Sequence, residues 1–208
     1  IMLAEISNKW VKKITQSIVI LPHFMSWTIV SMLSVAILSA NGVVNQLITM
    51  VGGKTIEFYN TPSVWPAILV ILKVWQGAGF GSIVYLATIT GIDASIYEAA
   101  AVDGASKTQC IFKVTLPMLK NTIIMLTIMS VGKIFNGDFG MIYAMVGSNS
   151  ILYPTTDVID TYLFRQLLEN PSMGQTAAVG LIQSILGFGF VVLCNKVANK
   201  WSPESALF

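Results

Sequence analysis

Residues 91–120 read GIDASIYEAAAVDGASKTQCIFKVTLPMLK, and this stretch decides how the chain is organised. It is too polar to lie in a hydrocarbon core, whereas the stretches on either side of it, 64–89 and 122–135, are strongly apolar. About 20 predominantly apolar residues form a helix that crosses a bilayer. The sequence therefore predicts a polar loop between two membrane-spanning helices.

The loop itself has the pattern of two short helices. Ser95 with Glu98 and Ser106 with Gln109 fit the capping box, in which side chains at the first turn satisfy free backbone N–H groups. Gly104 lies between them, where the first helix must end and a positive φ is favoured. We expect two short helices joined by a tight turn.

Composition places the whole chain in a membrane. It is 54% hydrophobic and 11% charged, with a mean hydropathy of +0.72, whereas soluble domains are about 25% charged. We expect an all-α, polytopic transmembrane helical bundle with four visible spans, the first kinked at Pro22. The third span can extend to residue 146. The expected spans cover residues 14–38, 64–89, 122–135 and 177–194.

Charge predicts the orientation and excludes one class of partner. The net charge of +2 and the absence of a basic run interleaved with aromatic residues argue against nucleic-acid binding. Basic residues favour cytoplasmic loops, and eight of the 12 Lys and Arg residues fall on one side of the expected spans. Both ends of the chain are then cytoplasmic, and so are Cys110 and Cys194, which we interpret as packing residues. Because the sequence opens at Ile1 without an initiator Met, we also expect a fifth span upstream.

The spacing within residues 91–120 resembles a known family. It matches the EAA loop of the binding-protein-dependent (MetI-like) permeases of ABC importers, E-A-A-x3-G-x9-hydrophobic-x-L-P, and fixes seven positions over twenty residues. Short sequence segments elsewhere in the chain, such as Ala177-Ala178-Val179-Gly180-Leu181, resemble those of carbohydrate permeases of the LplB type. The matching residues are Glu98, Ala99, Ala100, Gly104, Val114, Leu116 and Pro117.

This resemblance implies a function and a set of partners. The chain, 1–208, would be one permease domain in the bacterial cytoplasmic membrane, with residues 91–120 coupling it to an ATPase. Its partners would be a second, non-identical permease, two cytoplasmic ATPase subunits that hold ATP and Mg, and an extracytoplasmic binding protein that delivers a carbohydrate, expected to be an oligosaccharide. This chain would hold no cofactor and would not itself be an enzyme. A permease for peptides or amino acids is the main alternative, followed by a channel or a membrane enzyme.

Two lysines lie within expected spans, where ionisable side chains are costly and usually face a cavity. Lys73 and Lys133 could line the pathway, or they could extend to the membrane surface. The resemblance places the substrate pathway in the region that follows Lys133, and Trp75 and Gln183 carry side chains suited to sugars. The candidate pathway residues are Lys133, Asn136, Asp138, Tyr143, Trp75 and Gln183.

The loop of residues 147–176 is expected to be external. Thr156 can cap an amphipathic helix over residues 158–168, with Ile159, Tyr162, Leu163 and Leu167 on its apolar face. Its wet face would comprise Asp157, Asp160, Arg165 and Glu169, and we expect Asp157 and Asp160 to contact the binding protein. His23 has no clustered partner, so no metal site is expected.

Overall fold

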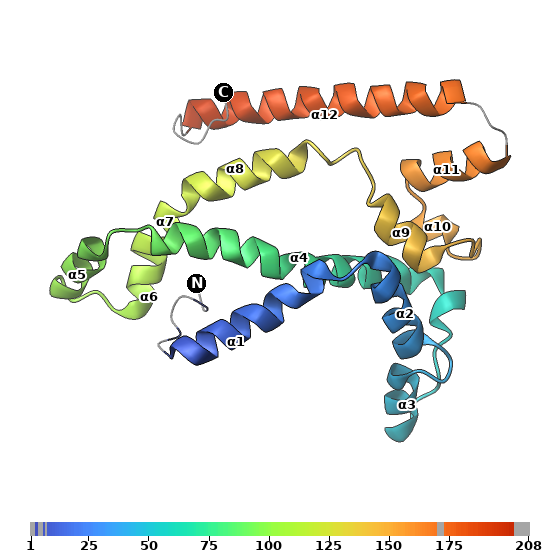
Figure 1. The fold of residues 1–208 in the computed structure, drawn as a ribbon, viewed down its shortest axis with the longest axis horizontal. Helices are drawn as coiled ribbons and strands as arrows, with labels where there is room; N and C mark the ends of the chain where they lie inside the picture. Colours follow the sequence, from blue (N-terminus) through green and yellow to red (C-terminus); the bar gives the residue numbers. More distant parts are fainter. Residues whose placement is uncertain (1–2, 4–5, 7, 170–172, 202–208) are drawn as a thin grey trace. The chain divides into compact units, whose positions relative to one another are not determined.

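The computed structural model describes residues 3, 6, 8–169 and 173–201, and all regular elements in this part of the chain are helical (Figure 1). The chain forms two compact units, and neither is continuous in sequence. Unit 1 comprises Ile1–Leu21, Ala78–Phe135 and Ile182–Phe208, and unit 2 comprises Pro22–Gly77 and Asn136–Leu181. The two longest helices, α4 (Trp65–Thr90) and α12 (Met173–Trp201), each contribute to both units.

Three helices in the described ranges are long and apolar enough to cross a membrane, covering Trp27–Met50, Pro62–Thr90 and Gly174–Lys200. A fourth span results if Lys107–Met118 and Lys120–Val131, which meet at a bend of 53°, are counted as one. The expected helical membrane fold is confirmed. The spans predicted at 64–89 and 177–194 correspond to α4 and α12.

The first predicted span, 14–38, is wrong as a single kinked helix. It is broken into α1 (Lys9–Ile20), a 3₁₀ turn η1 (Leu21–Phe24) and α2 (Trp27–Leu38). Pro22 lacks a backbone N–H, and the Ser26 hydroxyl accepts a hydrogen bond from the N–H of Ile29, which starts a new helix. The apolar stretch long enough to cross a bilayer therefore starts at Trp27 and continues through α3 (Val43–Met50).

The third predicted span does not extend to residue 146 as one helix. Helix α8 (Lys120–Val131) is followed by turns, and α9 (Phe139–Val146) is a separate helix. The Asp138 carboxylate accepts a hydrogen bond from the N–H of Met141, so α9 has its own N-terminal cap.

Close contacts at glycines hold the helices of unit 1 together. A Cβ atom at Gly79 in α4 would lie 2.0 Å from the carbonyl oxygen of Val19 in α1, and one at Gly187 in α12 would lie 2.7 Å from that of Gly132 after α8. Small residues at helix contacts let backbones approach closely in membranes. The glycines therefore determine the separation of α1 from α4 and of α12 from the end of α8.

Unit 2 has the larger apolar core. Trp65 and Leu152 are fully buried there, together with Val30 and Met145, and the indole N–H of Trp65 donates to the carbonyl of Phe58 at 2.8 Å. The short elements around this core are η2 (Phe58–Asn60), η3 (Pro62–Val64), α10 (Tyr153–Thr156) and α11 (Ile159–Glu169).

We predict that Gly79→Ala lowers the thermal stability of the chain in detergent. The added methyl would overlap the α1 backbone, and overpacking of this kind costs about 1–3 kcal/mol. Gly77→Ala and Gly81→Ala, on the same helix, are the matched controls, because a Cβ at either position meets no described atom within 4 Å. Both control variants should have melting temperatures equal to or above that of the wild type, since alanine favours helix by about 1 kcal/mol over glycine. Equal melting temperatures for all three variants would contradict the close contact at Gly79.

Candidate functional site

The predicted coupling segment, residues 91–120, forms the expected helix pair in unit 1. Its first helix is α5 (Ala94–Val102), and its second begins with α6 (Lys107–Cys110). The cap of α5 differs from the prediction: Asp93, rather than Ser95, is the N-cap, and its carboxylate accepts the N–H of Ser95 at 2.9 Å. Hydrogen bonds from the backbone and side chain of Ser95 hold the pKa of Asp93 below its usual range. Glu98 is thereby released from the role of capping-box partner.

The turn after α5 is a Schellman motif. Gly104 has a φ of +76°, and the N–H of Ala105 donates to the carbonyl of Ala100 while that of Gly104 donates to Ala101. A non-glycine residue in this left-handed conformation costs about 1–2 kcal/mol. The predicted positive φ at Gly104 is confirmed, and Ala100 has a structural role as one of the acceptors.

The second helix of the pair continues through a bend into helix α8 of unit 1. The Ser106–Gln109 capping box is present with both of its hydrogen bonds. Helix α6 continues as a π-helical stretch, η4 (Ile111–Thr115), then as α7 (Leu116–Met118), and bends by 53° into α8. Displacement of α6 would therefore act directly on α8.

Two hydroxyl contacts lie in and beside this segment of unit 1. The Tyr97 hydroxyl of α5 and the buried Thr115 hydroxyl of η4 lie 3.0 Å apart, and those of Thr88 in α4 and Thr122 in α8 lie 3.2 Å apart. The first contact joins the two short helices. The second joins the helices that precede and follow the segment.

The outer face of the pair combines charge with apolar groups. Glu98 and Ala99 are exposed, and Val102 at the end of α5 is 88% exposed. Phe112, in η4, is 64% exposed. Of the remaining residues of the predicted motif, Leu116 is half-buried and Pro117 is exposed in α7. Helix α5 lies outside every candidate span, so its apolar side chains are not explained by a bilayer core.

Asp138, a predicted pathway residue, is an organising group in unit 2. One of its oxygens caps α9, and the other forms an ion pair with the ammonium group of Lys73 on α4. The same ammonium lies 5.7 Å from the ring centroid of Trp27 on α2. Lys73 thus joins three helices of unit 2 instead of extending alone toward a membrane surface.

Tyr143 belongs to an aromatic cluster in the same unit. Its ring stacks on Phe139 at 5.3 Å and meets the edge of Phe164, from α11, at 5.0 Å. Tyr143 is still 41% exposed, and Trp75 on α4 is 42% exposed, so both aromatic side chains are partly accessible in unit 2. Asn136 is also exposed there.

The other two predicted pathway residues belong to unit 1. Lys133 is exposed in the turn after α8. Gln183 is buried in α12, and its amide donates to the carbonyl of Phe135 at 2.7 Å. Because this bond satisfies a backbone group freed where α8 ends, it gives Gln183 a structural role.

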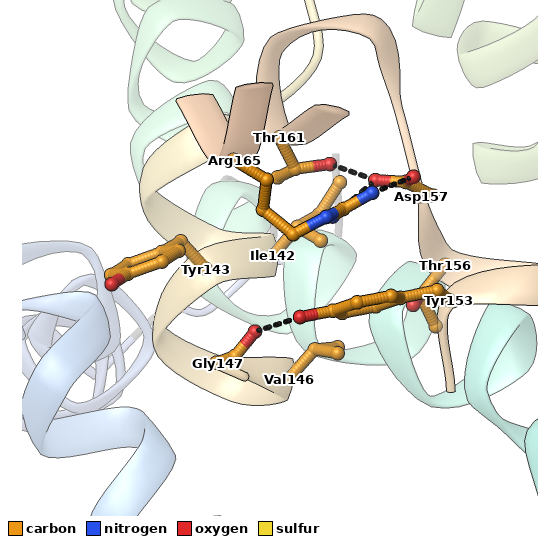
Figure 2. A pocket seen from close by; sticks show the side chains of 9 residues that line it. All are labelled: Ile142, Tyr143, Val146, Gly147, Tyr153, Thr156, Asp157, Thr161 and Arg165. Atoms are coloured by element: carbon orange, nitrogen blue, oxygen red, sulfur yellow. Dashed lines mark hydrogen bonds and ion pairs between the residues drawn. The ribbon is translucent and has the colours of Figure 1, made fainter. Parts of the chain in front are cut away.

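A polar cluster around Arg165 lies in unit 2 (Figure 2), and the sequence did not predict it. This arginine cluster comprises Arg165, Asp157, Thr161 and Tyr153. The Arg165 guanidinium forms a two-point ion pair with Asp157 and lies 3.9 Å from the ring centroid of Tyr153. Thr161 donates to the same carboxylate. The charged side chains are about a quarter exposed, at 23% for Arg165 and 24% for Asp157.

The cluster corrects the predicted faces of α11. The helix is present, but Thr156 does not cap it, because Thr156 ends α10 and its hydroxyl donates to Leu152. Asp157 and Arg165 are paired instead of forming a wet face, and the Asp160 carboxylate accepts the N–H of Gly137. On the predicted apolar face, Ile159 and Tyr162 are about half exposed, at 49% and 51%. The sequence missed this because a pairing eight residues apart does not follow from helical periodicity.

The space within the arginine cluster is small. It amounts to about 250 Å³, below the roughly 300–1,000 Å³ of most small-molecule sites. Across the described ranges, no three or more His, Cys, Asp and Glu side chains are grouped in a way that could hold a metal ion. The cluster is therefore best understood as a contact that holds α11 against α9 and α10.

The family of the chain follows from its match to a family model. The model for the binding-protein-dependent transport system inner membrane component matches residues 1–201, and the chain belongs to this family. It is 32% identical over 205 residues to the polygalacturonan/rhamnogalacturonan transport system permease protein YteP of Bacillus subtilis (strain 168), with 98% of this chain and 63% of that protein covered. It is 31% identical over 205 residues to protein LplB of the same organism, with 98% and 64% covered.

A solved structure agrees with this assignment. The crystal structure of a bacterial alginate ABC transporter in complex with an alginate pentasaccharide-bound periplasmic protein contains a chain that matches with a TM-score of 0.90 and 35% identity. The match covers 97% of this chain and 69% of that one. The chain spans less than two thirds of the length of the two Bacillus relatives.

We predict that the Asp157–Arg165 pair makes stability fall in acid. The Arg165 hydrogen bond holds the pKa of Asp157 below its usual range. A lowered folded-state pKa stabilises the fold above the unfolded-state pKa of about 3.9, and this stabilisation is lost as the pH falls through the folded value. At pH 7, Asp157→Asn should therefore lower the free energy of unfolding by about 1.5–3 kcal/mol, and the difference from wild type should shrink below about pH 4.

The measurement is denaturant unfolding of the detergent-solubilised chain at several pH values. Asp103→Asn is the control, because Asp103 is an exposed carboxylate at the end of α5. This substitution should change the free energy of unfolding little at any of these pH values. A deficit of Asp157→Asn that is the same at pH 3 as at pH 7 would show that the charge on Asp157 is not the source of the stabilisation.

Proposed function

We propose that this chain is a membrane-spanning permease subunit of an ATP-binding-cassette importer, with residues 91–120 as its contact with an ATPase. The observation that carries the proposal is the exposed helix pair of the coupling segment, closed by a glycine turn and continuous with a membrane helix. Membership of a family of inner membrane transport components supports it.

The helix pair has the physical properties of a docking element. Glu98 offers an exposed charge, and Val102 offers exposed apolar surface at the tip of α5. Because α6 leads through η4 and α7 into α8, movement of the docked pair would reach the membrane helices as a rigid-body displacement.

The remaining partners follow from this role. We expect a second, non-identical permease chain, two ATPase subunits that bind ATP and Mg, and an extracytoplasmic binding protein. The lysines of the coupling segment, Lys107, Lys113 and Lys120, favour a cytoplasmic position for it, which places both chain ends in the cytoplasm.

We propose a carbohydrate, specifically an oligosaccharide, as the transported substrate. The similar chains carry names or titles that refer to polygalacturonan, rhamnogalacturonan and alginate. The partly exposed aromatic side chains of Tyr143 and Trp75 in unit 2 suit sugar rings, and Asp138 and Asn136 can bond to hydroxyl groups. Lys133 and Gln183 are retained in the proposed pathway from the sequence prediction. The binding-protein contact of Asp157 and Asp160 also stays a prediction, and any test by charge reversal must allow for the internal bonds that both carboxylates make.

We predict that Gly104→Pro abolishes the ATPase activity that the loaded binding protein stimulates in the assembled transporter. Proline cannot adopt a φ of +76°, and it removes the N–H that bonds to Ala101. Gly104→Asn is the matched control, since asparagine tolerates the left-handed conformation and keeps the N–H. Membrane insertion should be unchanged in both variants, and full stimulation of Gly104→Pro would overturn the coupling role of this turn.

We predict that cysteines placed at residues 136 and 138 react with a water-soluble maleimide and that substrate protects them. The background chain carries Cys110→Ala and Cys194→Ala, which removes its two cysteines. Cysteine at Ile71, an exposed apolar position of α4 within a candidate span, is the lipid-facing control and should label slowly. Labelling at residues 136 and 138 that is as slow as at residue 71, or unaffected by oligosaccharide, would remove them from the pathway.

A further inference from the structure

An apolar groove runs between α8 and α12 in unit 1. It encloses about 770 Å³ of space, part of it open to the surroundings, which is ample for part of an acyl chain. None of the side chains that line it is charged. They are Ile123, Ile124, Thr127, Ile128, Leu193, Cys194, Val197 and Ala198.

The two helices that form the groove are antiparallel. Phe135 after α8 contacts Gln183 of α12, and Gly132 contacts Gly187, so residue numbers rise along α12 as they fall along α8. The start of α8 and the end of α12 therefore lie at the same end of the groove, as the ribbon shows (Figure 1).

Two exposed lysines lie at that end. Lys120 lies one helical turn before Ile123, and Lys200 lies one turn after Val197. Neither α8 nor α12 contains an Asp or Glu that could neutralise them. The groove thus has an apolar body and a cationic mouth.

We propose that this groove binds one anionic phospholipid, with an acyl chain along the α8–α12 seam and the phosphate held by Lys120 and Lys200. The arrangement matches both halves of such a lipid. Apolar side chains suit the acyl chain, and long lysine side chains extend from the helix ends to the headgroup region. Anionic lipids attract basic residues at the cytoplasmic surface of a membrane, the side on which these lysines are expected.

The Thr127 side chain does not alter the apolar character of the groove. Its hydroxyl donates to the carbonyl of Ile123 within α8, at 2.7 Å, and so is satisfied inside its own helix. A ligand in the groove therefore needs no polar group along its length. This favours a hydrocarbon chain over a sugar or a peptide backbone, whose polar groups would stay unpaired there.

The test is native mass spectrometry of the full-length protein that contains this chain, titrated with phosphatidylglycerol and, separately, with phosphatidylcholine of the same acyl chains. We expect phosphatidylglycerol to bind more tightly. Lys120→Gln and Lys200→Gln should each weaken its binding about fivefold, while phosphatidylcholine is unaffected. Lys54→Gln, an exposed lysine of unit 2, is the control for net charge and should change nothing.

A second pair of variants tests the body of the groove. Thr127→Trp fills it and should reduce binding of phosphatidylglycerol, whereas Leu186→Trp, at an exposed position of α12 outside the groove, should not. A photoactivatable phosphatidylglycerol should crosslink to peptides of α8 and α12 in the wild type only. Equal affinity for the two lipids, or unchanged binding in Thr127→Trp, would overturn the proposal. Crosslinking of a cysteine at residue 127 to a helix of a partner permease in the assembled transporter would also overturn it, because the groove would then be a subunit interface.

Discussion

The structure depends on one constraint: every backbone N–H and C=O group that leaves water must find a partner within the protein. Within a long helix these groups bond to one another, so partners outside the helix are needed only where a helix begins or ends. Ser26 supplies the acceptor where the chain restarts after Pro22, and Asp138 does so where α9 begins. At the end of α8, the amide of Gln183 bonds to the freed carbonyl of Phe135. At each of these three breaks a polar side chain supplies the missing partner.

A second property of the bilayer explains why helices in unit 1 meet at glycines. Lipid chains are as apolar as leucine, so helices in a bilayer associate through close packing more than through the hydrophobic effect. Gly79 against Val19 and Gly187 against Gly132 allow backbone contact. Closely packed helices do not deform gradually, and a push delivered at α6 would be carried into α8 and its neighbours as movement of a body.

Two ion pairs connect charged side chains in unit 2. Lys73 meets Asp138 beside the ring of Trp27, and Arg165 meets Asp157 above the ring of Tyr153. In both clusters a carboxylate near a helix start is joined to a cation that also contacts an aromatic face. The two pairs differ in the exposure of the cation: the Lys73 side chain is 56% exposed and that of Arg165 is 23% exposed, whereas the carboxylates of Asp138 and Asp157 are similar, at 27% and 24%.

The sequence by itself determined the elements whose signals are local. Hydropathy identified α4 and α12, and the spacing of Glu98, Ala99, Ala100 and Gly104 identified the family and the glycine turn, because helix length and turn chemistry depend on neighbouring residues. Other features were decided only by the tertiary structure. Pro22 could have kinked a helix or ended it, Ser95 and Asp93 could both have capped α5, and Arg165 could have faced water. In each case local propensity allowed both outcomes, and the folded structure realises one of them through a bond between residues two to eight positions apart: Ser95 to Asp93, Ile29 to Ser26, and Arg165 to Asp157 beside the ring of Tyr153.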